Sequence, residues 1–341
     1  MTLFAGMFLA LLSLQPGAGT APKAEIVDVK AIWSRAPHNA FTDLARFKDR
    51  WYCVFREGLA HGSPDGKIRV LTSLDGEVWT SAALLESNLG DLRDPKLSVT
   101  PDNYLMINGG VAVPDGEGVR HQSLVWFSQD GRQWPEPVEV ADPRMWIWRV
   151  TWYQGRAYGM AYRKQGGRTL RFYTSKNGSD FQTLVEQPFT GDGASEATLL
   201  FLPDHSALCL MRREGESRAA QLGKAMPPYR GWKWTDLGIR VGGPNLVRVP
   251  DGRIVAAVRL YEPVPRTALC WLDPVQNRLT EFLTLPSGGD TSYAGLVFHQ
   301  NLLWISYYSS HISKPMIYIA KVKLPTPPEE KPFDLNRYKG K

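Results

Sequence analysis

Ser73-Leu-Asp-Gly-Glu-Val-Trp79 recurs in the chain as Ser128-Gln-Asp-Gly-Arg-Gln-Trp134, and this phrase decides the fold. Each copy follows a run of β-forming residues, at 68–72 and 124–127. Asp and Gly favour a tight turn, because Asp bonds its own backbone and Gly adopts a positive φ readily. The Trp then anchors the returning strand through its apolar surface. A hairpin that recurs at a period of roughly 50 residues predicts a β-propeller.

Weaker hairpins extend the pattern along the chain. Residues 173–181 carry the phrase with Asn for Asp and Phe for Trp, and residues 271–277 hold a more degraded turn. Pro-Asp turns at 100–103, 202–205 and 249–253 alternate with these hairpins, and an apolar run follows each of them. Regularly spaced short strands also fit a β-sandwich, which is the alternative fold.

The length of the chain predicts the number of blades. No long helical period stands out, so the expected class is all-β. A four-stranded blade takes about 40–50 residues. The 341 residues therefore predict a six-bladed β-propeller over residues 22–325, with a mobile tail over residues 326–341.

The first residues resemble an export signal. Residues 3–14 are apolar but too short to span a bilayer, and small residues at 18–21 follow them. We interpret residues 1–21 as a signal peptide, which predicts a secreted or periplasmic protein without a membrane span. A buried N-terminal strand is the alternative, because no Lys or Arg precedes the apolar run.

Composition excludes several classes of function. Cys53, Cys209 and Cys270 are few, widely spaced and set in apolar runs, which predicts buried free thiols rather than disulfides or a zinc site. The net charge of +6 is dispersed, and no basic stripe with interleaved aromatics indicates nucleic acid. No cluster of metal ligands is evident, so we expect no cofactor. Among the scattered histidines, His61 and His311 are the two expected in a pocket.

Polar clusters at strand ends are not explained by a repeat that builds sheets. Charges that follow the strand at residues 51–55 belong at a rim of the propeller, and His61 or Asp65 there could donate a proton. A solvated ion pair explains that cluster equally well, and an ion-pair network explains residues 91–97. Aromatics that alternate with Arg149 suit a sugar-binding wall or blade packing. Five clusters carry such residues: 54–66, 91–97, 146–152, 195–198 with 212–214, and 290–293 with 307–311.

With these clusters in view, the chain resembles the sialidase (neuraminidase) superfamily over about residues 30–324. The two hairpin phrases look like shortened Asp-boxes, the BNR-type turn signature of that six-bladed propeller. Ser195-Glu196, followed by a strand, a Pro-Asp turn and a strand that ends Arg212-Arg213, is similar to the family's Glu-then-Arg blade. The segment that begins Ser292-Tyr293 is similar to the one that holds its Tyr nucleophile.

The resemblance implies the chemistry of a retaining glycosidase. A neutral Tyr293 phenol attacks the sugar and Glu196 takes its proton, because an unperturbed Tyr with a pKa near ~10 needs an adjacent base. Arg212 or Arg213, together with Arg266 or its alternative Arg259, would grip an anionic group. The acid/base falls in residues 57–65, where His61, Asp65 or Glu57 is the candidate.

One family residue is missing. Sialidases open with an Arg-Ile-Pro segment, and the matching place reads Ala-Phe-Thr-Asp-Leu at residues 40–44. The predicted function is an exported exo-glycosidase that acts on a terminal sugar, with acidic sugars among the candidates. The alternatives are a non-catalytic carbohydrate-binding propeller and a lyase-like or transglycosylating variant. The candidate binding residues are Arg56, Glu57, Arg93, Asp94, Arg149, Arg212, Arg213, Asn245, Arg259, Arg266 and Tyr308.

Overall fold

The computed structural model describes residues 23–116, 118–163 and 169–327, in which every regular element is a β-strand. The signal-peptide prediction falls on residues outside this description, as does most of the predicted C-terminal tail. Residues Ala24–Leu324 form one unit by themselves. In the described ranges there is no helix of the length and apolarity that a bilayer span requires.

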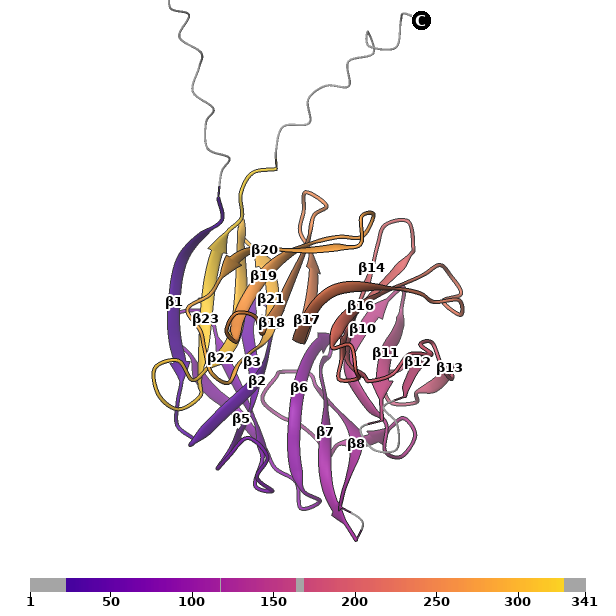
Figure 1. Ribbon diagram of the computed structural model, residues 1–341. Coiled ribbons are helices and arrows are strands. Elements are labelled where there is room, and N and C mark those ends of the chain that lie inside the picture. The colour runs from indigo at the N-terminus through magenta and orange to yellow at the C-terminus, as the bar shows by residue number, and fades with distance from the viewer. Residues whose placement is uncertain (1–22, 117, 164–168, 328–341) are drawn as a thin grey trace, which may run out of the picture. The chain divides into compact units, whose positions relative to one another are not determined.

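Antiparallel meanders build the sheets, and four of these sheets have four strands each (Figure 1). The first holds β2 (His38–Phe47), β3 (Arg50–Gly58), β4 (Lys67–Ser73) and β5 (Thr80–Leu85); the second β6 (Asp91–Val99), β7 (Leu105–Asp115), β8 (Gly118–Ser128) and β9 (Val138–Val140). The third holds β10 (Trp146–Tyr153), β11 (Arg156–Tyr162), β12 (Leu170–Ser175) and β13 (Gln182–Val185); the fourth β21 (Thr291–His299), β22 (Leu302–Ser309), β23 (Met316–Lys323) and β1 (Glu25–Trp33).

The remaining strands form one sheet of seven, so the expectation of six separate four-stranded sheets is wrong. The cause is β17, which pairs with β16 through residues 233–240 and with β18 through residues 241–248 without a break. The seven strands are β14 (Ala194–Phe201), β15 (Ala207–Arg213), β16 (Ala219–Ala225), β17 (Lys233–Arg248), β18 (Ile254–Leu260), β19 (Arg266–Asp273) and β20 (Arg278–Thr284).

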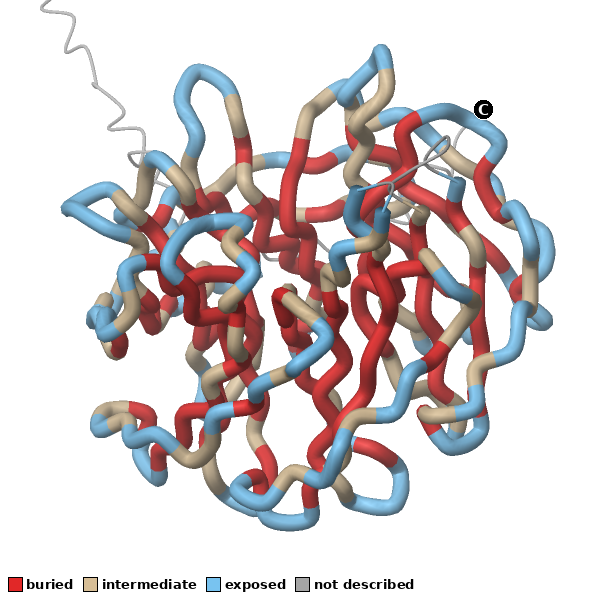
Figure 2. The backbone as a smooth tube through the Cα atoms, turned by 90° about the horizontal axis from the view of Figure 1, so that it is seen from below, coloured by how far each residue is buried: buried red, intermediate tan, exposed pale blue. Residues whose placement is uncertain are grey.

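The sheets are arranged as in a β-propeller, because their innermost strands form a closed ring. β2 contacts β6, and contacts then pass through β10, β14, β17 and β21 back to β2. Buried segments gather around this ring, while exposed loops lie at the periphery (Figure 2). The N-terminal strand β1 completes the last sheet by pairing with β23, from Glu25 opposite Lys323 to Trp33 opposite Ile317.

The repeated hairpin lies between the third and fourth strands of its sheet, as its strand–turn–strand pattern predicts. In the first copy, Asp75 Oδ1 accepts hydrogen bonds from the backbone N–H of Glu77 (2.8 Å) and Val78 (3.1 Å), and Ser73 Oγ accepts from Gly76 N (2.9 Å). The copies that begin at Ser128 and Ser175 repeat these bonds.

Glycine in this turn also links neighbouring sheets. Gly76 has φ 79°, and a Cβ added to it would lie 2.5 Å from the Trp304 ring of the last sheet. Gly131 stands in the same relation to Tyr52 of the first sheet, at 2.2 Å. The turn therefore needs glycine for its positive φ and for this close approach. The three cysteines are buried and free, as predicted.

Candidate active site

Bulges in the innermost strands aim side chains at the centre of the ring. In each of these strands two residues face one residue of the partner strand, at 41–42, 94–95, 148–149, 195–196, 243–244 and 293–294. Phe41, Asp94 and Tyr293 have positive φ values of 62°, 50° and 52°. Non-glycine residues adopt such values at a cost, and such strained positions inside a strand often mark a functional site.

A pocket of about 240 Å³ opens where these bulges meet. This volume is below the roughly 300–1,000 Å³ of sites for drug-sized ligands, so it suits a single sugar ring. The residues that line it come from eight strands and two loops: Phe41, His61, Arg93, Asp94, Trp146, Tyr162, Ser195, Glu196, Arg212, Glu214, Arg259 and Tyr293.

Tyr293 and Glu196 lie in direct hydrogen-bond contact, as the sequence comparison requires. The Tyr293 hydroxyl donates to Glu196 Oε1 at 2.6 Å, and both side chains are buried. Arg212 Nη1 donates to the same carboxylate oxygen (2.8 Å) and to the Tyr293 oxygen (2.9 Å). Gly243 N donates to Glu196 Oε2 at 2.6 Å, which fixes the carboxylate in place.

The electrostatics of this group keep the phenol protonated until a base acts. Burial raises the pKa of Tyr293 well above its usual value, and the charge of Glu196 raises it further, against the opposing charges of Arg212 and Arg259. Deprotonation therefore requires the adjacent carboxylate. Arg212 lies within reach of both oxygens and can stabilise a phenolate as it forms.

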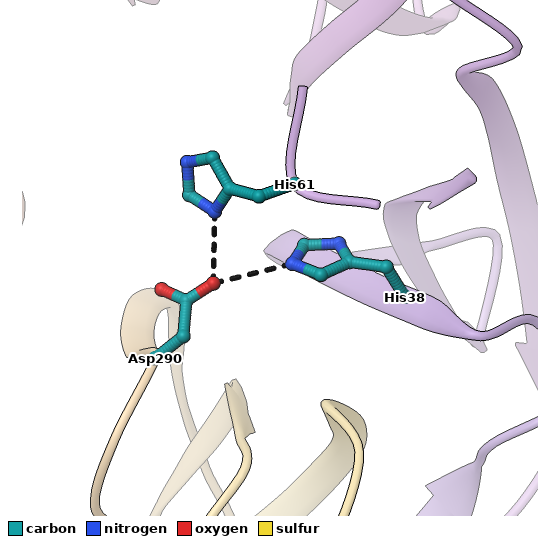
Figure 3. Close-up of side chains that lie close together, drawn as sticks. All are labelled: His38, His61 and Asp290. Atoms are coloured by element: carbon teal, nitrogen blue, oxygen red, sulfur yellow. Dashed lines mark hydrogen bonds and ion pairs between the residues drawn. The ribbon is translucent and has the colours of Figure 1, made fainter. Parts of the chain in front are cut away.

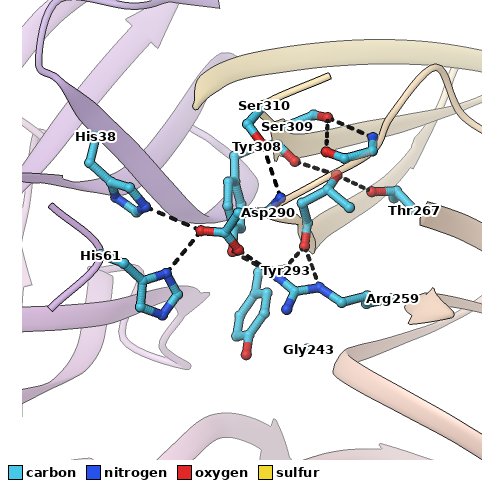
Figure 4. Close-up of polar contacts among 12 residues, drawn as sticks. His38, His61, Gly243, Arg259, Thr267, Asp290, Tyr293, Tyr308, Ser309 and Ser310 are labelled. Atoms are coloured by element: carbon cyan, nitrogen blue, oxygen red, sulfur yellow. Dashed lines mark hydrogen bonds and ion pairs between the residues drawn. The ribbon is translucent and has the colours of Figure 1, made fainter. Parts of the chain in front are cut away.

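A second polar group surrounds Asp290 beside the pocket (Figure 3; Figure 4). His38 Nε2 and His61 Nδ1 both approach Asp290 Oδ2, at 3.2 Å and 2.9 Å. Tyr308 (2.7 Å) and Arg259 Nη2 (3.0 Å) donate to Asp290 Oδ1. Burial alone would raise the pKa of Asp290, but these hydrogen bonds and the Arg259 charge hold it far below its usual range.

Because Asp290 is a carboxylate, it accepts hydrogen from both histidines, so His38 Nε2 and His61 Nδ1 carry protons. His61 then presents Nε2 for proton transfer, and its side chain is 57% exposed. The three ligand atoms lie within 4.8 Å of one another and could also hold a cation. Arg259 already supplies a positive charge to the same carboxylate, so an ion is not needed to balance it.

Asp94, which lines the pocket, and Lys96 near the Tyr293 ring are both buried. Burial raises the pKa of Asp94, although Arg93 and Lys96 oppose the shift. Asp94 Oδ1 has no hydrogen-bond partner among the described residues. Burial and the Arg149 charge lower the pKa of Lys96 to about 8. Its Nζ lies 6.0 Å from the centre of the Tyr293 ring.

Aromatic rings form one wall of the pocket. Trp146 stacks parallel to Tyr162, with ring centres 6.1 Å apart and planes at 6°, and it stacks on His121 behind (4.9 Å). Trp148 lies deeper, against the Tyr293 ring at 5.6 Å. Trp146 and Tyr162 therefore add aromatic surface to the pocket lining, whereas Trp148 is buried outside it.

Several residues proposed from the sequence do not line the pocket. Arg149 grips Asp43 with both Nη atoms (2.7 Å and 3.2 Å) inside the ring. Arg213 pairs with Asp192, and Arg266 pairs with Glu281 at 2.6 Å. Of the two candidates for the third arginine, the pocket thus holds Arg259.

The loop that carries His61 is held by two of the other candidates, Arg56 and Asp65, whereas Glu57 bonds outside this loop. Arg56 is buried and bonds Asp91 (2.6 Å) and the Ala60 carbonyl (2.8 Å). Asp65 accepts from Leu59 N at 3.0 Å, and Glu57 pairs with Arg69 at 2.8 Å. Two further candidates lie outside the pocket lining: Asn245 donates to the Ala294 carbonyl, and His311 bonds Ser309.

Some site residues had no clear signal in the sequence. Phe41 lines the pocket through the bulge at 41–42, and a bulge cannot be read from residue types. Tyr162 is the last residue of β11 and no pattern marked it, whereas Glu214 stood in the polar cluster at 212–214. Asp290 stood beside Tyr293 in a polar cluster, so proximity to the candidate nucleophile was the signal that could have found it. His38 meets it only through the closure of the ring.

No protein-family model and no curated protein sequence matches this chain. Solved structures do match. A protein of unknown function from Dyadobacter fermentans has a TM-score of 0.79 at 17% identity, over 89% of this chain and 100% of that chain. An α-L-arabinanase from Penicillium chrysogenum, complexed with arabinobiose, has a TM-score of 0.66 at 12% identity, over 87% of this chain and 98% of that one.

A sialidase from Trypanosoma rangeli has a TM-score of 0.65 at 11% identity, over 90% of this chain but only 60% of the sialidase. At such identities the likeness shows the fold alone. The fold is therefore a β-propeller similar to those of the Trypanosoma rangeli sialidase and the Penicillium chrysogenum arabinanase.

Proposed function

We propose that this chain is an exo-acting glycoside hydrolase that removes a terminal sugar with retention of configuration. The observation that carries the proposal is the 2.6 Å hydrogen bond between Tyr293 and Glu196, set in a pocket of single-sugar size. Arg212 bridges both groups. The sialidase-like fold of known glycosidases supports the same reading.

In the first step, Tyr293 Oη attacks the anomeric carbon as the glycosidic bond breaks. The phenol proton passes to Glu196 Oε1, and the leaving oxygen takes a proton from His61 Nε2. In the second step, water attacks the anomeric carbon and gives its proton to His61. Tyr293 leaves and recovers its proton from Glu196, so both residues return to their starting states.

Asp290 acts in this scheme as a positioning residue. It holds His61 by Nδ1 (2.9 Å) and so turns Nε2 toward the substrate. This is the role that a buried carboxylate has beside the histidine of a catalytic triad. Asp65 and Glu57 are less suited to the acid/base role, because they bond the backbone or an arginine away from the pocket.

The finer features of the fold are part of the proposal. We count the seven-stranded sheet as two blades that share β17, which gives six blades around the ring of six innermost strands. The repeated turns, with their Ser and Asp hydrogen bonds, correspond to shortened Asp-boxes. The apolar start of the chain supports export to the periplasm or medium.

A non-catalytic carbohydrate-binding propeller is the second candidate. The observation that favours it is Phe41, a buried phenylalanine where the sialidase pattern has a substrate-binding arginine. Glycan binding without hydrolysis across a broad panel would select this function.

The test is hydrolysis of a panel of aryl and alkyl glycosides by the wild type and by Tyr293→Phe. We expect turnover to fall by at least 10³-fold in the variant, because the nucleophile is lost. Tyr318→Phe is the matched control, since its buried hydroxyl bonds no described residue. Full activity in Tyr293→Phe would exclude the mechanism.

The same panel tests His61. Loss of a general acid slows substrates with poor leaving groups most, because good leaving groups depart without a proton. We expect His61→Ala to lose its activity on alkyl glycosides and to retain much of its activity on nitrophenyl glycosides. An equal loss on both classes would assign His61 a role other than proton donation.

A further inference from the structure

Two of the arginines that line the pocket are already paired with carboxylates of the chain. Arg93 Nη1 donates to Asp91 Oδ2 at 3.1 Å. Arg212 donates to Glu196 at 2.8 Å and also pairs with Glu214. Both guanidinium groups are largely buried, so these pairs are shielded from salt and from water.

Arg259 is the third arginine, and its partners come from the segment that holds the nucleophile. Nη2 donates to Asp290 Oδ1 at 3.0 Å and to the Tyr308 hydroxyl at 2.8 Å, and Nε donates to the Thr291 carbonyl at 2.8 Å. Figure 4 shows the Asp290 carboxylate between Arg259 and the two histidines. Asp290 is thus fixed as an anion directly at the guanidinium.

The charges of the lining balance without a ligand. Three arginines line the pocket together with three carboxylates, which are Asp94, Glu196 and Glu214. An anionic sugar would meet no unpaired arginine in this described lining, and it would be repelled by Asp94 and Asp290. Displacing Asp290 from Arg259 would leave a partly buried carboxylate without its cation, which is unfavourable.

We infer that the pocket takes a neutral, hydroxyl-rich sugar. The Asp290 carboxylate occupies the position at Arg259 that the carboxylate of an acidic sugar would otherwise take. The inference rests on the proposed function only for the location of the sugar. On this inference the chain differs from hydrolases of acidic sugars in the charge of the ligand that its pocket accepts, although the fold is similar.

Two features of the pocket suit such a ligand. Asp94 lines the pocket and its Oδ1 is buried without a hydrogen-bond partner among the described residues, so a sugar hydroxyl that donates to this carboxylate would offset part of the cost of its burial. Trp146 and Tyr162 add apolar aromatic surface to the lining, against which the C–H face of a sugar ring can pack. Neither feature requires charge on the ligand.

The experiment compares ligands that differ only in charge. The free acid and the methyl ester of 4-nitrophenyl β-D-glucuronide form one pair, and those of the methyl glycoside of N-acetylneuraminic acid form a second. Calorimetry with the wild type at pH 7 should show the esters bound at least tenfold more tightly than the acids. Tighter binding of the acids would overturn the inference.

Asp290→Asn supplies the second arm, because it leaves Arg259 without its carboxylate. We expect the preference for the ester to shrink about tenfold or to reverse. Asp251→Asn is the matched control, since it removes the carboxylate partner of Arg253 on an exposed turn, and it should keep the wild-type preference. An unchanged preference in folded Asp290→Asn, checked by circular dichroism, would also overturn the inference.

The wild-type comparison needs no variant, so it stands even if Asp290→Asn unfolds. Failures of the two proposals are distinguishable. Ester preference in binding without hydrolysis of any substrate would reject the Tyr293 mechanism and keep the neutral pocket. Hydrolysis that depends on Tyr293 but favours the acids would do the reverse.

Discussion

At the scale of single residues, the site is built from charges that burial makes costly and neighbours make tolerable. Asp290 gains enough from two histidines, Tyr308 and Arg259 to remain a carboxylate. Asp94 does not gain enough, because Arg93 and Lys96 offset only part of the burial cost and its pKa is raised. An unfavourable buried charge at a pocket wall is typical of a functional position.

Asp94→Asn should therefore raise stability and lower activity. A carboxyl group whose folded pKa is raised stabilises the fold below its ordinary pKa, and that contribution is lost as the pH rises through the folded value. The variant should melt above the wild type at pH 7, and the gap should narrow toward pH 4. Thermal melts at both pH values check this.

Activity should change in the opposite direction. In the proposed complex a sugar hydroxyl donates a hydrogen bond to the Asp94 carboxylate, and a hydrogen bond to a charged group contributes about 1.5–3 kcal/mol. Asn at this position weakens that bond, which should lower kcat/KM on the best neutral glycoside roughly 10- to 100-fold. A variant that is less stable at pH 7, or as active as the wild type, would contradict this role for Asp94.

At the scale of elements, the bulge is the device that turns a strand into part of a site. In each innermost strand the antiparallel register is regular on either side of the bulge and shifts by one residue across it. In β17 the bulge contains Gly243, with φ 55°, whose N–H holds Glu196. A Cβ on this glycine would lie 2.8 Å from the Tyr293 ring.

Gly243→Ala should abolish activity with a modest loss of stability. The methyl group would push on Tyr293 and disturb its bond to Glu196, beyond the cost of about 1 kcal/mol for a positive φ at alanine. Gly155→Ala is a matched control, because Gly155 has φ 73° but nothing within 4 Å of an added Cβ. Denaturation of both variants measures the cost of a positive φ at alanine, and activity assays measure the displacement of Tyr293. Equal losses of activity in the two variants would contradict the proposed contact of the new methyl group with Tyr293.

At the scale of the whole molecule, local patterns predicted more than pairings across the chain. The repeated phrase at Ser73 and Ser128 identified the hairpins, because turn chemistry is local. The contact of Glu196 with Tyr293 was predicted only through resemblance to a family. The shared strand β17, the return of β1 to the last sheet and the meeting of His38 with Asp290 depend on how the ring closes, which no short segment encodes.

Closure of the ring should make β1 a determinant of the whole fold rather than a loose edge. Trp33 ends β1 with 6% of its surface exposed, and its Nε1 donates to Glu57 of the first sheet, so it joins the last sheet to the first. Trp33→Ala should lower the free energy of unfolding by about 3–5 kcal/mol, as other large-to-small core changes do. Val27→Ala on the same strand, where the side chain is half exposed, should change it by less than about 0.5 kcal/mol. Urea denaturation, followed by tryptophan fluorescence and by hydrolytic activity, should give coincident transitions for both variants. If Trp33→Ala loses the pairing of β1 while the pocket stays active, the ring closes without β1 and the prediction is wrong.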